Sequence, residues 1–131
     1  MAIKEYALKE LGIFKNYKIT YSNFHVSTDN MNGHDEPKFY PKNGNEYKKD
    51  HILMSNIRPY FNKVWYANRS GSKSPGILSF EVANKEIVIP KFLYYYICSN
   101  KFNEYWSKTS KGTTMPVGDK NAILNYLFKI P

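Results

Sequence analysis

Two short apolar segments, residues 52–54 and 64–67, frame the most informative stretch of the sequence. Both are rich in aliphatic, β-branched or aromatic side chains, and both predict buried strands. The residues between them, 55–63, mix polar, cationic and aromatic side chains. Because Pro59 has no backbone N–H group and disfavours a helical conformation at Arg58, we expect the chain to turn here and to hold these side chains on a loop.

Alternating apolar and polar positions predict further strands in other parts of the chain. These strands span residues 17–21, 24–28, 77–82 and 127–130. Clusters of turn-forming residues predict three connecting loops, the last of them cationic and flexible. The loops span residues 29–37, 41–45 and 69–76.

Apolar residues at helical spacing predict short helices near both ends of the chain and a longer helical region between them. The first covers residues 3–11, and Asp119 can cap the last, which runs through Tyr126. Pro90 can occupy the first turn of the middle region, which breaks near Ser99. Two apolar stripes of this region, which we expect in the core, are formed by Phe92, Leu93, Tyr96 and Ile97 and by Phe102, Tyr105, Trp106 and Thr109.

This order of elements predicts an α+β fold with a mainly antiparallel twisted sheet and packed helices. The chain of 131 residues shows no internal repeat and no linker, so we expect a single domain over residues 1–131. Nothing resembles a signal peptide, and no apolar run approaches the length of a membrane span. We therefore expect a soluble, cytoplasmic protein that does not enter a membrane.

The charge balance of the chain indicates a polyanionic partner. Lys and Arg outnumber Asp and Glu by 19 to 11, which gives a net charge of +8. A small basic domain attracts nucleic acid first and an anionic membrane surface second. All but two of the cations are lysines, so Arg58 and Arg69 stand out, because arginine is the better reader of bases and phosphates.

The residue pattern does not predict an enzyme, a metal site or a cofactor. Cys98 is the only cysteine, and the three histidines have no metal-ligand spacing. Residues 71–74, GSKS, lack the Gly-Lys-Ser/Thr core of a phosphate-binding loop. Residues 56–60, NIRPY, loosely resemble the Asn-Pro-Pro-Tyr motif of amino-methyltransferases, but the first proline and any G-x-G turn are missing.

Four segments in order resemble motifs of one known family. They are VSTDNM at 26–31, ILMSNIRPYFNKVW at 52–65, PKFLYY at 90–95 and SKGTTMPVGDK at 110–120. Each is weak alone, but together, at fitting spacings, they resemble the target recognition domain of type I restriction-modification specificity subunits. The resemblance covers about residues 26–131, and residues 1–25 match the family poorly.

The resemblance implies a non-catalytic module that recognises one half of a bipartite double-stranded DNA target. Its implied partners are the methyltransferase and restriction subunits of a type I system. A complete specificity subunit carries two such domains separated by long helices, whereas this chain has one and stops where the spacer helix would start. We therefore expect either an excised domain or a truncated half that pairs with a second half-subunit. Val117 stands where the family commonly has an arginine, which removes one candidate phosphate contact.

The polar loops carry the two kinds of group that a DNA-reading protein needs, those that fix it on phosphates and those that read bases. For base readout we predict Asn30, Ser55, Asn56 and Arg58, with Tyr60 beside them for stacking. For contacts with the DNA backbone we predict Lys63, Arg69, Lys73, Lys108, Lys111, Thr113 and Thr114. The alternative for each residue is a solvated surface group or a hydrogen bond that stabilises its loop.

Two other functions remain open from the sequence. A truncated interaction protein that pairs with or inhibits restriction-modification subunits would expose an apolar patch on the helices of residues 91–109. A small nucleic-acid enzyme, such as a nuclease, would show cleavage that depends on a divalent metal.

Overall fold

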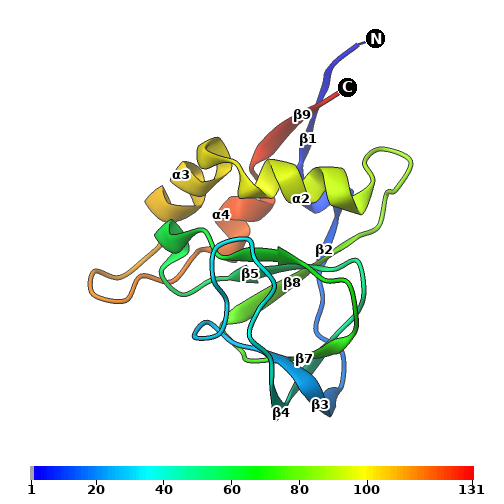
Figure 1. Ribbon diagram of the computed structural model, residues 1–131. Coiled ribbons are helices and arrows are strands. Elements are labelled where there is room, and N and C mark those ends of the chain that lie inside the picture. The colour runs from blue at the N-terminus through cyan, green and yellow to red at the C-terminus, as the bar shows by residue number, and fades with distance from the viewer. Residues whose placement is uncertain (1) are drawn as a thin grey trace.

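A computed structural model describes residues 2–131 of the chain (Figure 1). The first half contains, in order, β1 (Lys4–Ala7), α1 (Leu8–Leu11), β2 (Gly12–Phe14), β3 (Ile19–Val26), β4 (Tyr40–Tyr47), β5 (Ile52–Ser55), the 3-10 turn η1 (Pro59–Phe61) and β6 (Val64–Tyr66). The second half contains β7 (Gly71–Lys73), β8 (Ile77–Val82), α2 (Pro90–Cys98), α3 (Asn100–Lys108), α4 (Lys120–Leu124) and β9 (Leu127–Ile130).

A four-stranded antiparallel sheet, in the order β2-β8-β5-β6, lies at the centre of the molecule. Helices α2, α3 and α4 cover one face, and β3, β4 and β7 lie against the other (Figure 1). Each of these three strands pairs with the other two, and only the β3–β7 pair is parallel. Strands β1 and β9 form a separate antiparallel pair. The structure thus confirms an α+β fold with mainly antiparallel sheets.

Strand β5 of the central sheet is buried on both faces, which explains why residues 52–54 form an apolar run. In β5, Ile52 and Met54 pack in the cluster beneath the helices. Leu53 lies between them on the opposite face and packs with Trp65 and Ile77. Because successive side chains of a strand point to opposite faces, a strand covered on both sides favours consecutive apolar residues.

The helix boundaries for which the sequence carries a local signal agree with the structure. Helix α2 begins at Pro90, Ser99 caps α3 by accepting a hydrogen bond from the Phe102 N–H, and Asp119 accepts from the Ala122 N–H at 3.1 Å. The predicted core stripes are confirmed by four fully buried residues, Leu93, Ile97, Phe102 and Trp106. Phe92 of the same stripe is instead exposed.

The N-terminal part of the chain differs from the prediction. The helix expected at residues 3–11 is a strand, β1, followed by a single helical turn, α1. Residues 4–7 extend because they pair with 127–130 at the other end of the chain, a partner that local periodicity does not reveal. The two strands expected at 17–21 and 24–28 form one strand, β3, with a register shift between Ser22 and His25.

Two predicted loops, 41–45 and 69–76, contain strands instead, and the physical reason lies in their glycines. A Cβ atom on Gly44 would collide with the Lys73 carbonyl oxygen, and one on Gly71 would collide with the Phe24 carbonyl oxygen. These glycines therefore permit backbones to approach closely within the three-stranded unit. A glycine that suggested a turn from its neighbours serves here to pack strands.

Candidate nucleic-acid interface

The loop between β5 and β6 is a strained turn held in one shape. Its centre is η1, and the residues on either side, Arg58 and Asn62, have φ angles of 52° and 51° in the left-handed region. Such conformations cost on the order of 1–3 kcal/mol each for residues other than glycine, and persist only where surrounding contacts impose them. Here the contacts come from α2 and α3: Asn62 Nδ2 donates to the Cys98 carbonyl at 2.9 Å, and Asn103 Nδ2 donates to the Pro59 carbonyl at 2.8 Å.

The loop that follows α3 is joined to this turn. The Arg58 N–H donates to the Pro116 carbonyl at 2.7 Å, and Ile57 forms a β-bridge with Val117. Lys111 and Val117 exchange backbone hydrogen bonds of 2.9 and 2.8 Å and so close the second loop on itself. The loops 55–63 and 108–118, far apart in the sequence, therefore form one rigid unit.

Asn56 joins the two loops from the inside. Its Oδ1 atom accepts a hydrogen bond from Trp106 Nε1 at 3.0 Å, and its Nδ2 atom donates to the Gly118 carbonyl at 2.9 Å. Its own carbonyl accepts from the Gly118 N–H at 2.9 Å. Only 6% of Asn56 is exposed, and a Cβ atom on Gly118 would collide with its amide. The Asn56 side chain is thus bonded within the fold and, contrary to the prediction, does not point toward a base.

Two other residues predicted to read bases also have structural partners. Asn30 Nδ2 donates to the carbonyls of His25 and Lys38 at 2.7 and 3.0 Å, and its Oδ1 atom accepts from the Ser27 N–H at 2.7 Å. Ser55 is buried, with its hydroxyl 3.4 Å from the Ile57 carbonyl. Both side chains organise the loops from below and do not present themselves to a ligand.

Arg58 is placed differently from these residues. Within residues 2–131 its guanidinium makes no hydrogen bond and no ion pair, although its backbone is held firmly. The side chain is half-buried at the junction of the two loops. A free guanidinium on a fixed backbone is suited to a bidentate contact with a base edge.

Most of the remaining predicted contacts lie on the outer side of the same unit. The exposed residues are Tyr60, Lys108, Lys111, Thr113 and Thr114. Lys111 Nζ lies 3.8 Å from Asp119 Oδ2, an exposed pair of little energetic weight. Half-buried Lys63 donates to the Thr28 carbonyl at 2.7 Å. The segments 55–63 and 108–118 together carry four cations and no carboxylate, a charge balance that suits contact with a polyanion.

Two of the predicted backbone contacts do not belong to this unit. The Arg69 guanidinium lies over the Phe24 ring at 4.6 Å and 3.4 Å from Glu36 Oε1. Lys73 is only 2% exposed, and its Nζ atom donates to Asn16 Oδ1 at 2.6 Å and to the Ile77 carbonyl at 2.9 Å. Contrary to the prediction, Lys73 cannot reach a phosphate from this position and is not part of the interface.

The buried Lys73 leads to a prediction about pH. Burial lowers the pKa of its ammonium to about 8, below the value of about 10.4 expected in the unfolded chain. Between these two values the unfolded chain binds the extra proton, so the free energy of unfolding rises with pH. From pH 7 to 9 we expect a gain of about 1 kcal/mol from this residue.

Urea unfolding of the parent and of Lys73→Met, compared at pH 7 and pH 9, measures this contribution. The difference between the two pH slopes isolates Lys73, because every other titrating group is common to both proteins. Equal slopes would show that Lys73 keeps its ordinary pKa in the folded protein.

On the face of the central sheet away from the helices, His51, Ser79 and Glu81 lie together. Their arrangement resembles a catalytic triad but is structural. His51 Nδ1 lies 2.8 Å from Ser79 Oγ, and His51 Nε2 lies 3.1 Å from Glu81 Oε1. Ser79 is 1% exposed, so its hydroxyl is closed to a substrate, and the Lys48 N–H also donates to His51 Nδ1. Burial lowers the pKa of His51 and so favours the neutral ring, which joins the turn before β5 to β8.

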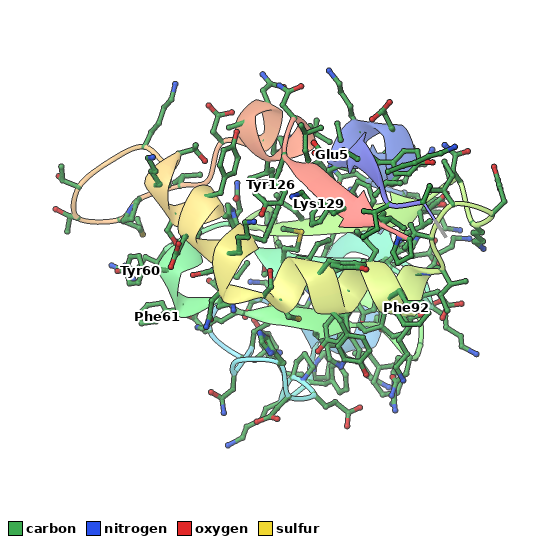
Figure 2. All side chains as sticks on the ribbon, turned by 90° about the horizontal axis from the view of Figure 1, so that it is seen from above. Glu5, Tyr60, Phe61, Phe92, Tyr126 and Lys129 are labelled. Carbon is green, nitrogen blue, oxygen red and sulfur yellow. The ribbon has the colours of Figure 1, made fainter. Side chains whose placement is uncertain are left out.

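Within residues 2–131 no group of three or more His, Cys, Asp or Glu side chains could hold a metal ion. No helix in this range is long and apolar enough to cross a membrane. Sequence reasoning missed an exposed aromatic residue of the joined loops, Phe61, which lies beside Tyr60 at the edge of the domain (Figure 2). Its only signal was a large apolar side chain directly after a predicted turn.

No protein-family model and no curated protein matches the chain. Solved structures do match, and each of the three described here covers 98% of this chain. One comes from work on complex assembly and conformational transition of a type I restriction-modification system, with a TM-score of 0.75 and 16% identity. Another is the HsdS subunit from Thermoanaerobacter tengcongensis, with a TM-score of 0.72 and 16% identity.

The type I restriction-modification S subunit from M. genitalium matches with a TM-score of 0.68 and 14% identity. The chain spans 38% of the length of the first two matching chains and 34% of the third. At these identities the likeness is one of fold. The chain therefore has a fold that occurs in type I restriction-modification S subunits, of whose length it spans about one third.

Proposed function

We propose that this chain recognises one half of a bipartite double-stranded DNA target as the specificity module of a type I restriction-modification system. The observation that carries the proposal is the rigid unit of loops 55–63 and 108–118. It presents four cations, two threonine hydroxyls and no carboxylate from a fold shared with specificity subunits. In this proposal the chain is not an enzyme, and methyl transfer and cleavage belong to partner subunits.

Side-chain burial and hydrogen bonding support different proposed roles for these residues. Arg58 is the proposed base reader, because its guanidinium is free while its backbone is fixed to Pro116. The proposed phosphate contacts are Lys63, Lys108, Lys111, Thr113 and Thr114. Asn56 and Asn30 support them by holding the loops in place.

The proposed function is tested by selecting bound sequences from a random pool of duplex DNA. The chain is used alone at low salt and, separately, with the methyltransferase subunits of a type I system. We expect enrichment of one short half-site, sharper in the assembled complex, because the complex adds contacts that hold the module on DNA. A pool that stays random in both experiments would contradict sequence-specific recognition.

Binding of the chain to random-sequence duplex should weaken steeply with salt. Neutralising about four phosphates gives a plot of log K against log salt with a slope of about −3 to −4. Fluorescence anisotropy titrations measure the slope, and Lys108→Ala should reduce its magnitude by about one. Lys129→Ala is the matched control, because Lys129 is exposed on β9 and away from both loops (Figure 2). A flat plot, or an equal effect of both variants, would contradict the assignment.

A second candidate function, an interaction protein, is favoured by one observation on helix α2. Phe92 and Tyr95 are exposed, and a cavity of about 320 Å³ lies beside Phe92, lined by Ile87, Ile89 and Ile130 among others. Such an apolar surface can dock a partner subunit, with or without DNA binding. The two functions are separated by adding the chain to a complete complex, since a pure inhibitor would reduce methylation without binding DNA itself.

A further inference from the structure

Two neighbouring aromatic rings project from the joined loops without burying themselves in the core. Tyr60 is 50% exposed and Phe61 is 55% exposed, and their ring centroids lie 4.7 Å apart. Figure 2 shows both side chains at the edge of the domain, on the side of the 108–118 loop. Exposed rings of this size, placed side by side, form a contact surface and not an isolated apolar residue.

The backbone beneath these rings is rigid, which distinguishes them from side chains on a mobile loop. Their turn, η1, is bounded by Arg58 and Asn62 in left-handed conformations. Its first residue, Pro59, is buried, and the Pro59 carbonyl accepts a hydrogen bond from Asn103. Strain imposed by surrounding contacts is a feature of ligand-binding segments. The surrounding contacts thus hold a strained backbone in place, and this backbone presents the two rings outward.

The charge around the rings selects the class of ligand. Lys63 Nζ lies 5.5 Å from the centroid of Phe61, and the two loops also carry Arg58, Lys108 and Lys111, of which Lys111 lies 3.8 Å from Asp119. An apolar protein partner would not pair with the four cations. Nucleic acid would, because its phosphates lie beside the flat faces of its bases. Aromatic rings within a basic surface are the arrangement that proteins use to stack on bases.

We propose that Tyr60 and Phe61 form an aromatic wedge that stacks on bases at an opened base-pair step of the DNA. The proposal rests on the proposed DNA-binding function and adds a mode of contact to it. The wedge would read the ease with which a step opens, because inserting a ring between base pairs costs stacking energy that depends on sequence. It would therefore contribute specificity without hydrogen bonds to base edges.

The test compares two duplexes of the same sequence, one intact and one with a central abasic site opposite 2-aminopurine. A wedge enters the abasic duplex without unstacking a base pair, so we expect the parent protein to bind it about tenfold more tightly. The emission of 2-aminopurine should fall on binding, because the rings stack on the exposed base. The double variant Tyr60→Ala/Phe61→Ala should lose both effects yet bind the intact duplex with an unchanged salt slope.

Phe92→Ala is the matched control, because Phe92 is an equally exposed phenylalanine on α2, at the opposite end of the domain (Figure 2). It should keep the preference for the abasic duplex, and urea unfolding should show all variants folded. Equal binding of both duplexes by the parent protein would overturn the wedge and leave the proposed DNA recognition intact. Failure to bind either duplex, even at low salt, would overturn the proposed function itself.

Discussion

Replacing Asn56 with alanine is expected to lower the free energy of unfolding by about 2–4 kcal/mol. The change removes the hydrogen bonds from Trp106 Nε1 and to the Gly118 carbonyl. Trp106 is fully buried, so its N–H group would be left without a partner and without water. Urea unfolding followed by tryptophan fluorescence measures the loss.

Two further variants make the Asn56 result specific. Asn121→Ala, at an exposed position of α4, should change the free energy of unfolding by less than about 0.5 kcal/mol. Asn56→Ala should cost less in a Trp106→Phe background, because no indole N–H remains to be orphaned, and the difference is the coupling energy of the pair. If Asn56→Ala is as stable as the parent but changes the selected DNA sequence, Asn56 reads bases after all.

Replacing Arg58 with alanine is expected to relax base preference at one position of the half-site. A guanidinium that meets guanine in a bidentate contact contributes about 1–3 kcal/mol of discrimination against other bases. Arg58→Lys keeps the charge but not the fork, so it should relax the preference almost as much while keeping general affinity. The measurement is the affinity of each variant, in the assembled complex, for a panel of half-site variants.

Lys111→Ala is the comparison for Arg58 on the same unit. The Lys111 side chain is 82% exposed on the second loop and offers a phosphate only a point charge. Its removal should weaken binding to all sequences about equally and reduce the salt slope by about one. A uniform loss in Arg58→Ala as well would make Arg58 a phosphate clamp. Unfolding of that variant would make it a structural residue.

These predictions rest on a division between polar groups that face solvent and those that face inward, which the sequence pattern alone did not provide. Asn56 and Arg58 are two residues apart on one polar loop, and the sequence predicted base readout for both. The structure gives both the Oδ1 and the Nδ2 atom of Asn56 a partner within the fold and leaves the Arg58 guanidinium free within residues 2–131. Asn56 therefore stabilises the interface that Arg58 is proposed to use.

The sequence by itself determined the elements whose signals are local. A strand buried on both faces requires an unbroken apolar run, which made β5 readable at residues 52–54. Pro90 and Asp119 marked helix starts, because a missing N–H group or a capping oxygen acts within one helical turn. The break expected near Ser99 is where α2 ends and α3 begins. The turn at Pro59 belongs to the same class.

Only the tertiary structure decided the elements that depend on partners distant in the chain. Residues 4–7 are a strand because they pair with 127–130, and β7 is a strand because β3 and β4 surround it. The same enclosure took Lys73 out of solvent, although its neighbours suggested a flexible loop. Backbone groups pair with whichever segment folding brings beside them, so a pairing between remote segments leaves no mark on the local alternation of apolar and polar residues.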